Sequence, residues 1–553
     1  MLRHHRRIAA EHKGRQKASI SSDRPRFCQG TFSRYSLSGP PLKGLFFEIN
    51  LGHFMDPLFE IELERPIPGS RDAGHHLYRQ LKGAIQDGRL AAGTQLPASR
   101  RSADFFGLSR NTVAEVYERL SNDGLVVARH GSGTYVADLP PEPESSPSPA
   151  STYRLNAFWL QEDVTAAMGF WRDDPPAVPR NESPLDFRPA LIDPRLFPFD
   201  VFRRVSAKQL RGLEKKPAAF KSPQGNQGNF HLREAITNHI ALTRAVVCRP
   251  EDVVVTAGAQ QAFDLLARIL VTPGETVVAV EDPGYPPMRV AFAAAGARIM
   301  PVEVDEEGLV VDSLPPGLGV ICVCPSHQFP LGVTMSKRRR AALIDFARRH
   351  GAVIVEDDYD GEFRYDGNPL QSLRASDAAD VVFYVGTFSK CMLPSLRLGF
   401  VVVPEWARRT LVAAKNCLDW HCSTPLQTGV SAFIAEGHLA HHVRKMRQIY
   451  KRRRQLLLDL LKRDFSDWLE PIPSLYGIHV AAWARHGVDL DAAVQALAGC
   501  SVKIHTLGRY HLMQSPRPGL VFGYGAVDLP EIERGLAALK GVLAPPHQRT
   551  TKD

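Results

Sequence analysis

Apolar and amphipathic segments alternate along most of the chain, from about residue 185 to residue 545. Short runs of β-branched and other apolar residues, typical of buried strands, lie at 253–256, 276–280, 320–323, 352–356, 381–385 and 399–403. Segment 259–270 has helical spacing, and segment 434–464 predicts a helical connection, dense in Arg and Lys, to a smaller C-terminal lobe. This alternation predicts an α/β fold with a large, parallel-rich sheet covered by helices.

Residues 56–138 have another pattern, which predicts three short helices and a hairpin. The first helix is expected over 75–90, where leucine and isoleucine recur every four residues. The second is expected over 100–106, and Gly107 separates it from a third helix that begins after Ser109, a good N-cap residue. Two short helices joined by a glycine turn and followed by a basic-tipped hairpin form the winged helix-turn-helix pattern.

Three motifs in this region resemble the GntR-type winged helix-turn-helix family. They are L-P-A-S-R at 96–100, L-S-R-N-T-V at 108–113 and G-S-G-T-Y-V at 131–136. The resemblance implies that the region binds double-stranded promoter DNA. The residues expected at the DNA are Arg100, Arg110, Asn111 and Thr112 on the helices, and Arg129, His130 and Gly131 at the hairpin tip.

Segments without periodicity precede and separate these two regions. Residues 1–55 predict a basic, disordered extension, because the first 50 residues hold ten Lys and Arg and three acidic residues, +7 of the chain's net +9. Residues 139–184 predict a linker that begins Pro/Ser-rich and contains one apolar patch, which we expect to dock on one of the domains. The expected domains are thus 56–138 and 185–545.

Composition narrows the class of protein. Apolar residues make up 44% of the chain, and the eight cysteines have neither paired nor zinc-binding spacing. We find no apolar run of about 18 residues and no signal-peptide pattern. These features predict a cytoplasmic protein of a reducing compartment, with no metal site.

The most informative stretch is 381–403, V-V-F-Y-V-G-T-F-S-K-C-M-L-P-S-L-R-L-G-F-V-V-V. Two predicted strands flank a polar turn, which places Lys390 just outside a strand end, where α/β proteins bind their ligands. A lysine in an apolar pocket can attack a carbonyl group. Thr387, Ser389 and Arg397 could hold a phosphate beside that amine.

Other predicted strand ends supply matching groups. The turn before Ala259 and Gln260 leaves backbone N–H groups at a helix N-terminus, which suits a phosphate. Tyr285, on a Pro/Gly turn, could present its ring to a flat ligand. The stretch E-D-D-Y-D at 356–360 offers several carboxylates around Tyr359, able to bind a metal, act as a base or pair with a ring nitrogen.

Together these groups suit pyridoxal 5'-phosphate, with Lys390 forming the aldimine. The motifs T-F-S-K, R-L-G-F, E-D-D-Y-D-G-E-F-R-Y and D-P-G-Y-P also make residues 185–545 similar to class I aminotransferases of fold-type I. The resemblance implies a ring-nitrogen partner at Asp357, a 3-hydroxyl partner at Tyr359 and a stacking ring at Tyr285. Joined to the GntR-like region, the chain resembles the MocR-type (GabR- and PdxR-like) transcriptional regulators.

The chain departs from the aminotransferase pattern at positions that bind substrate. Val521 stands where the enzymes have an arginine for the substrate carboxylate, and Pro287 replaces a second arginine of GABA-responsive members. Phe329 precedes Pro330 where the enzymes have the Asn of N-P-T-G. Arg289 and Arg517 are candidates for the missing clamp, which is worth roughly 1.5–3 kcal/mol.

The favoured hypothesis is a PLP-dependent DNA-binding regulator that senses PLP, an amine or an amino acid through an aldimine at Lys390. The resemblance implies a head-to-tail homodimer. The alternative is a functional aminotransferase with a DNA-binding head: Val521 argues against turnover, whereas Lys390, Asp357 and Tyr359 support it. A third possibility is a DNA-binding protein whose second domain binds no ligand.

Overall fold

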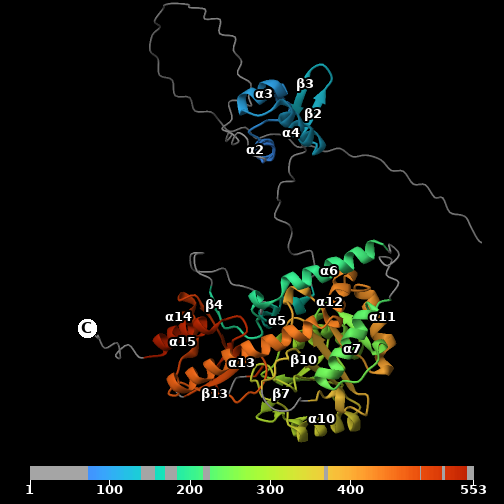
Figure 1. The fold of residues 1–553 in the computed structure, drawn as a ribbon, viewed down its shortest axis with the longest axis vertical. Helices are drawn as coiled ribbons and strands as arrows, with labels where there is room; N and C mark the ends of the chain where they lie inside the picture. Colours follow the sequence, from blue (N-terminus) through green and yellow to red (C-terminus); the bar gives the residue numbers. More distant parts are fainter. Residues whose placement is uncertain are drawn as a thin grey trace, which may run out of the picture. The chain divides into compact units, whose positions relative to one another are not determined.

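The computed structural model describes residues 72–138, 156–168, 184–215, 225–365, 371–485, 487–513 and 517–544. The chain divides into two compact units, Met1–Thr152 and Tyr153–Asp553, each described here by itself (Figure 1). The predicted extension 1–55 and the Pro/Ser-rich stretch 139–155 lie outside the described residues. In the described part of the chain, no helix is both long and apolar enough to cross a membrane.

In the first unit, the described residues 72–138 form three helices and a small sheet. Its elements are α2 Ala73–Gln86, β1 Gln95–Leu96, α3 Ser99–Phe106, α4 Arg110–Asn122, β2 Val126–Arg129 and β3 Gly133–Val136. The predicted helices and hairpin are present, although α2 ends at Gln86 and the helix was predicted to extend to residue 90. The sheet has the order β1-β3-β2, in which the two-residue β1 was not predicted from the sequence.

Local sequence sets the boundaries of α3 and α4. Gly107 ends α3 with φ 67°, the left-handed conformation that glycine adopts at low cost. The Ser109 side chain accepts a hydrogen bond from the Thr112 amide and so caps α4. The apolar face of α4, including Val113 and Leu120, is buried against the other helices. The opposite face of α4 is therefore left at the surface.

The second unit is built on an eight-stranded sheet of order β5-β12-β11-β10-β9-β6-β7-β8. Its strands are β5 Val253–Thr256, β6 Val277–Asp282, β7 Arg298–Asp305, β8 Gly308–Leu309, β9 Val320–Val323, β10 Val353–Asp358, β11 Val382–Thr387 and β12 Gly399–Val402. The central strands are parallel, whereas β12 is antiparallel to both of its neighbours. The prediction of a parallel-rich sheet is confirmed.

Helices cover both faces of this sheet. One face packs against α8 Ala259–Leu270, α9 Pro286–Ala294 and α11 Arg408–Leu418. The other face packs against α7 Phe230–Arg244, α10 Lys337–His350, α12 Thr424–Ala435 and α13 His438–Asp464, with α6 Phe199–Glu214 beside α12. Because successive residues of a strand point to opposite faces, each strand contributes to two cores.

The smaller lobe follows α13, the long helix that leads into it (Figure 1). The segment predicted as one helical stretch is two helices, because Gly437, with φ 81°, separates α12 from α13. The lobe consists of β13 Leu469–Pro471, β14 His479–Ala484, β16 His505–Thr506 and β17 Gly519–Gly523, with α14 Leu490–Gly499 and α15 Leu529–Leu543. Strand β4 Leu185–Asp186 pairs with β15 Val502–Lys503.

Part of the predicted linker, residues 156–168, forms helical structure. Residues 156–168 form a short 3₁₀ turn, Ala157–Leu160, and helix α5 Glu162–Met168. Val164 and Ala167 are buried against Val290 of α9, and Phe158 packs on the same cluster. The apolar patch of this segment therefore docks on the second unit, and the prediction of linker structure was wrong for these residues.

Candidate functional site

A cavity of about 850 Å³ lies between the strand ends and helices α8 and α9. It is lined by all nine residues predicted to hold the cofactor: Ala259, Gln260, Tyr285, Asp357, Tyr359, Thr387, Ser389, Lys390 and Arg397. They come from separate stretches of the chain, which the parallel strands bring to one edge of the sheet.

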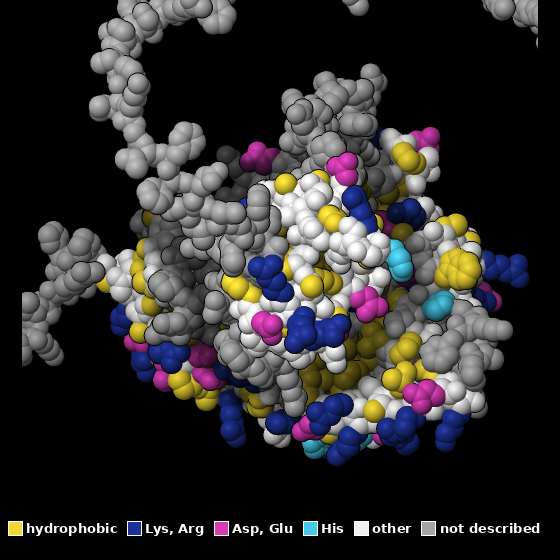
Figure 2. Space-filling view, turned by 90° about the horizontal axis from the view of Figure 1, so that it is seen from above, with side chains coloured by type: hydrophobic (Ala, Val, Ile, Leu, Met, Phe, Trp, Pro, Cys, Tyr) yellow, Lys and Arg dark blue, Asp and Glu magenta, His cyan; other side chains and the backbone are white. Residues whose placement is uncertain are grey.

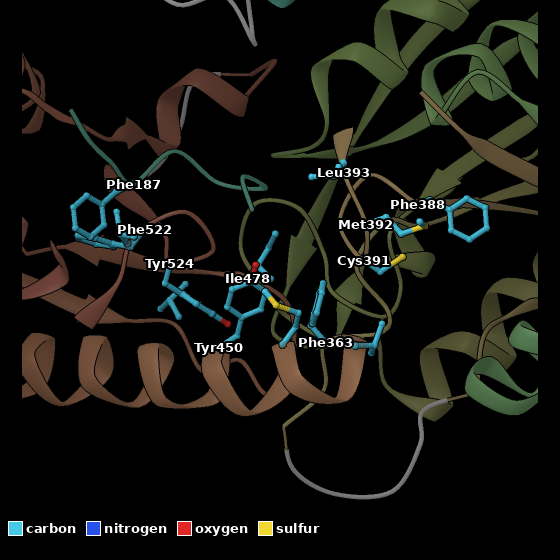
Figure 3. Close-up of a cluster of buried hydrophobic side chains, with 14 of the residues drawn as sticks. Phe187, Phe363, Phe388, Cys391, Met392, Leu393, Tyr450, Ile478, Phe522 and Tyr524 are labelled. Carbon is cyan, nitrogen blue, oxygen red and sulfur yellow. The ribbon is translucent and has the colours of Figure 1, made fainter. Parts of the chain in front are cut away.

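Lys390 lies in the turn between β11 and β12. Its neighbours Phe388, Cys391 and Met392 are buried in the core, which anchors the turn (Figure 3). The Lys390 Nζ donates a hydrogen bond of 2.6 Å to the carbonyl oxygen of Ala190. Burial lowers the pKa of the Lys390 amine to about 8, against the opposing effect of Asp360 and Asp357. An amine with this pKa is a better nucleophile at neutral pH than an exposed lysine.

The four carboxylates at 356–360 have different surroundings. Glu356 accepts hydrogen bonds from the amides of Leu373 and Arg374, and Asp358 pairs with Arg244 at 2.6 Å. These two side chains lie on the sheet face that packs against α7 and α10, whereas Asp357 lies on the cavity face. The structure thus assigns structural contacts to two of the carboxylates and leaves Asp357 at the cavity.

Asp357 fits the nitrogen of a pyridine ring. Its side chain is 3% exposed, and Oδ1 has no hydrogen-bond partner among the described residues. Burial, followed by the nearby Asp358 and Asp360, raises the pKa of the Asp357 carboxyl to about 8. A buried polar atom without a partner is costly, and a protonated ring nitrogen would satisfy it.

A cradle for a phosphate lies at the N-terminus of α8. The first helical residues, Ala259 and Gln260, have amide groups without partners inside the helix. Gly258 has φ 82°, and a Cβ there would lie 3.0 Å from Nη2 of Arg397, so glycine is needed for this approach. Thr387 Oγ1 and Ser389 Oγ, 2.9 Å apart, complete the cradle.

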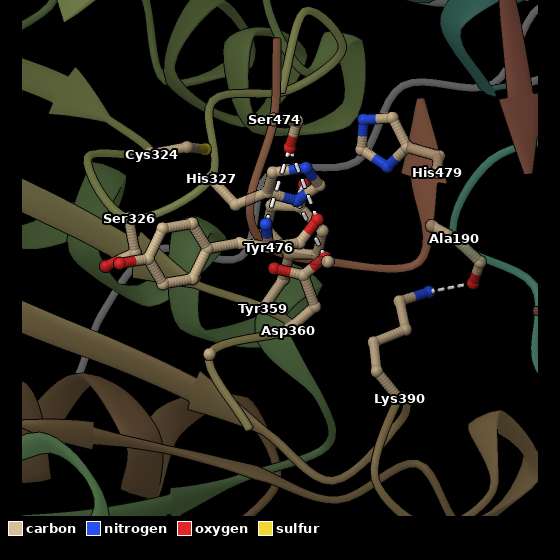
Figure 4. A network of polar contacts seen from close by, with 12 residues as sticks. Ala190, Cys324, Ser326, His327, Tyr359, Asp360, Lys390, Ser474, Tyr476 and His479 are labelled. Carbon is tan, nitrogen blue, oxygen red and sulfur yellow. Dashed lines mark hydrogen bonds and ion pairs between the residues drawn. The ribbon is translucent and has the colours of Figure 1, made fainter. Parts of the chain in front are cut away.

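The Tyr359 hydroxyl contacts a buried polar cluster (Figure 4). Its hydroxyl lies 2.9 Å from Nδ1 of His327, which is also 2.9 Å from Oδ2 of Asp360. Burial raises the pKa of the Asp360 carboxyl to about 8 and lowers the pKa of His327 to about 3. The cluster is therefore neutral at pH 7, and it fixes the phenol whose hydroxyl would meet the cofactor 3-hydroxyl.

His479 joins this cluster: its ring lies 4.5 Å from that of His327, and Nε2 lies 3.0 Å from the carbonyl oxygen of Pro330. Two imidazoles and a carboxylate within 4.8 Å of one another are also a set that metal ions favour. Here one nitrogen of each ring is used in a hydrogen bond. Neither histidine belongs to the set of site residues predicted from the sequence.

Replacing His327 by alanine is expected to lower the free energy of unfolding by at least about 1–3 kcal/mol, because the buried Asp360 loses its hydrogen-bond partner. Denaturant unfolding followed by tryptophan fluorescence measures this change. His441, exposed on α13, is the control for loss of an imidazole. Equal stability of the two variants would contradict a structural role for the His327–Asp360 contact.

The two arginines considered as a substitute clamp do not line the cavity. Arg289 lines a separate small pocket beside His511. Arg517 pairs with Glu470 at 2.7 Å and lies over the ring of Trp483. The cavity instead contains Arg188, which the sequence analysis did not consider because the residue belongs to no recognised motif.

The predicted DNA-binding residues occupy the surface of the first unit. Arg100, Arg110, Asn111, Arg129, His130 and Gly131 are exposed, and Thr112 is half-buried. Thr112 is partly engaged within the unit, since its hydroxyl lies 2.8 Å from that of Ser109. At the hairpin, the Arg129 guanidinium lies 4.7 Å from the centre of the Tyr135 ring.

Charged side chains are dispersed on the face seen in space-filling view. Lys and Arg lie singly or in small groups among acidic and hydrophobic side chains (Figure 2).

Comparison with known proteins agrees with this geometry. The family model for aminotransferase class I and II matches residues 197–479, and that for bacterial regulatory proteins of the gntR family matches residues 74–136. The probable rhizopine catabolism regulatory protein MocR of Rhizobium meliloti is 32% identical over 84% of this chain and 92% of its own length. The pyridoxine biosynthesis transcriptional regulator PdxR of Corynebacterium glutamicum is 30% identical over 82% of this chain and 92% of its own length.

Solved structures match the second unit. The alpha-aminoadipate aminotransferase LysN of Thermus thermophilus, complexed with N-(5'-phosphopyridoxyl)-L-leucine, has a TM-score of 0.59 and 27% identity, over 65% of this chain and 92% of that one. The multiple substrate aminotransferase of Thermococcus profundus has a TM-score of 0.61 and 23% identity, over 70% of this chain and 97% of that one.

The second unit thus has the fold of the class I and II aminotransferases, whose cofactor is pyridoxal 5'-phosphate, and the first is a GntR-type winged helix-turn-helix. With these two parts in one chain, the protein belongs to the MocR-type transcriptional regulators, which join a GntR-type DNA-binding domain to an aminotransferase-like domain. The prediction of a regulator of this family is confirmed.

Proposed function

We propose that this regulator binds promoter DNA through α4 and the β2–β3 hairpin and senses an amine-containing ligand at Lys390. The DNA contacts would be made by Arg100, Arg110, Asn111 and Thr112, and by Arg129, His130 and Gly131 at the hairpin tip. The observation that most supports the sensing role is the cavity, where an amine of lowered pKa lies among phosphate-binding and ring-binding groups.

Each part of the cofactor has a proposed partner. Asp357 would pair with the ring nitrogen, Tyr359 would donate to the 3-hydroxyl and Tyr285 would stack on the ring. The α8 N-terminus, Thr387, Ser389 and Arg397 would bind the phosphate, as in the phosphate sites of other helix N-termini.

Bound here, pyridoxal 5'-phosphate supplies an aldehyde carbon for which Lys390 and an amine ligand compete. The free Lys390 amine donates a hydrogen bond to the Ala190 carbonyl, so this contact would differ between a Lys390 joined to the cofactor and a Lys390 displaced by a ligand. A ligand that binds two states of the domain unequally shifts the population between them, and thereby the DNA affinity. Sensing would require only that a ligand amine replace the Lys390 amine at the cofactor, without formation of a product.

Turnover, as in an aminotransferase, would also require a positioned substrate carboxylate. Val521 is buried in an apolar cluster where the enzymes have an arginine. Position 521 therefore supplies no carboxylate partner, so an enzyme, unlike a sensor, would need a cation from elsewhere in the cavity. Incubation of the protein with PLP, an amino acid and a keto acid distinguishes the two: a single change in absorbance supports the sensor, and repeated formation of product supports the enzyme.

The direct test of the proposal is a titration of labelled DNA from upstream of the protein's own gene. The protein is loaded with PLP and then given single amines and amino acids. A ligand that changes both the cofactor absorbance and the DNA affinity supports the proposal. If every compound that changes the absorbance leaves the DNA affinity unchanged, the sensing role is wrong.

We further propose a head-to-tail homodimer in the cytoplasm, as the resemblance to the family implies. Supporting it, large apolar side chains are exposed at the end of α11: Leu418 is its last residue, and Trp420, just beyond it, is 64% exposed. Exposed apolar groups close together are typical of protein contacts. Light scattering of the purified protein would show twice the monomer mass, and a monomer would contradict the proposal.

The rate at which the cofactor-free protein captures PLP is expected to rise with pH. Only the neutral amine of Lys390 attacks, and its pKa is lowered to about 8, so the rate should rise roughly tenfold from pH 6 to pH 7 and level off above about pH 8. A profile still rising at about pH 10 would contradict the lowered pKa.

A further inference from the structure

The cavity extends beyond the groups proposed to hold the cofactor. One wall is apolar and is formed by Val290, Ala291 and Ala294 of α9, with Trp159 and Ala167 of segment 156–168. We call these five residues the apolar wall. A hydrocarbon group placed against it would be removed from water, which is favourable in proportion to its area. The wall therefore suits an apolar side chain.

Arg188 adds a positively charged group to this otherwise apolar part of the cavity. Its side chain lines the same cavity and is 12% exposed. The carboxylate of Asp186 accepts from Nε and Nη2 of Arg188, at 2.9 and 2.6 Å, which holds the guanidinium in one orientation. An oriented guanidinium inside a cavity is a strong partner for a carboxylate, because the two form short, charge-assisted hydrogen bonds.

Arg188 lies near the place that the enzymes' missing arginine would occupy. Val521 faces His505 across the β16–β17 pair and is buried in one cluster with Ala190 and Phe329. The backbone carbonyl of Arg188 lies against β17, because a Cβ on Gly523 would be 2.2 Å from that oxygen. Burial, together with the charges of Arg509 and Arg188, lowers the pKa of His505 to about 3.

We propose that Arg188 binds the carboxylate of the effector and that the apolar wall receives its side chain. The effector is then an amino acid with an apolar side chain, and its amine lies beside Lys390. This inference rests on the proposed sensing role of Lys390 and specifies the class of ligand. In this protein the carboxylate partner is Arg188, which follows β4, whereas in the enzymes it is an arginine at the position of Val521 in β17.

The apolar wall also connects the ligand to the rest of the chain. Trp159 and Ala167 belong to the segment that residues 139–155 join to the DNA-binding unit. An effector side chain against this wall would contact that segment directly. The inference therefore includes a physical connection between the ligand and the tether of the DNA-binding domain.

The test compares amino acids with the amines that lack their carboxylate. The probes are L-phenylalanine with 2-phenylethylamine and L-leucine with 3-methylbutylamine, titrated against the absorbance of the PLP-loaded, full-length protein. In the unaltered protein each amino acid should bind roughly tenfold or more tightly than its amine, because of the charge-assisted contact. Arg188→Met should remove this preference while the amines bind as before. Arg517→Met is the control and should keep it.

A second variant tests the apolar wall independently. Ala294→Phe fills the space beside α9 and should weaken binding of L-phenylalanine about tenfold while leaving L-alanine unchanged. The inference is overturned if amino acids and amines bind equally to the unaltered protein, or if Arg188→Met retains the preference. No absorbance response to any of the five compounds would instead overturn the sensing role of Lys390 itself.

Discussion

Lys390→Ala is expected to abolish covalent retention of PLP and the absorbance response to amines. The variant loses the only lysine that lines the cavity in the described part of the chain. The phosphate cradle and Asp357 remain, so weaker, reversible binding of PLP should persist. Borohydride reduction followed by mass spectrometry of peptides measures the loss: the unaltered protein should carry the cofactor mass on Lys390, and the variant on no lysine.

The control for this experiment is Lys462→Ala, near the end of α13, where the side chain is exposed. It removes an amine without touching the cavity and should retain both the label and the response. DNA affinity of the cofactor-free protein should be unchanged in both variants, since neither residue belongs to the DNA-binding unit. Cofactor attached to Lys390→Ala at another lysine would show that the reactive amine is misassigned.

Arg110→Ala should weaken specific DNA binding by about 1–3 kcal/mol, or roughly fivefold to 150-fold. Arg110 is the first residue of α4 and is exposed, and N-terminal residues of a recognition helix reach base edges. An arginine can bind guanine through two hydrogen bonds, which alanine cannot replace. Fluorescence anisotropy with the promoter DNA and with scrambled DNA, at one salt concentration, measures the change.

The comparison with scrambled DNA separates base reading from attraction to phosphate. If Arg110 hydrogen-bonds a base, its replacement should weaken binding to the promoter much more than binding to scrambled DNA. Arg89→Ala is the matched control, because it removes an exposed positive charge of the same unit that pairs with Asp87. If Arg110→Ala and Arg89→Ala had equal effects on both DNAs, α4 would not be the recognition helix.

Local features of the chain were predictable because they depend on neighbouring residues. Helix α8 begins and ends where its spacing predicts, and Ser109 caps α4 as its side chain favours. The apolar runs on either side of Lys390 are strands β11 and β12. Their antiparallel pairing could not be predicted, since it depends on where β5 docks.

The sequence also predicted nine residues that line the cavity. Each residue lies at a strand end or a helix start, and parallel strands bring such positions together at one edge of a sheet. The part that the sequence left open was the choice among carboxylates. Tertiary packing decided it, because α7 supplies Arg244 to Asp358 whereas Asp357 lies on the cavity face.

By itself the sequence determined the domain types, and it predicted Lys390 as the reactive lysine and the loss of the enzymes' arginine at Val521. Only the tertiary structure showed that Arg188 lies in the cavity as a possible replacement for that arginine. Arg188 precedes Lys390 by about two hundred residues in no recognised motif, and Arg289 and Arg517 were the more obvious candidates. The pairing of β4 with β15 and the packing of the following chain against β17 bring Arg188 to the cavity. Such an arrangement depends on the whole fold, and no local pattern of residues specifies it.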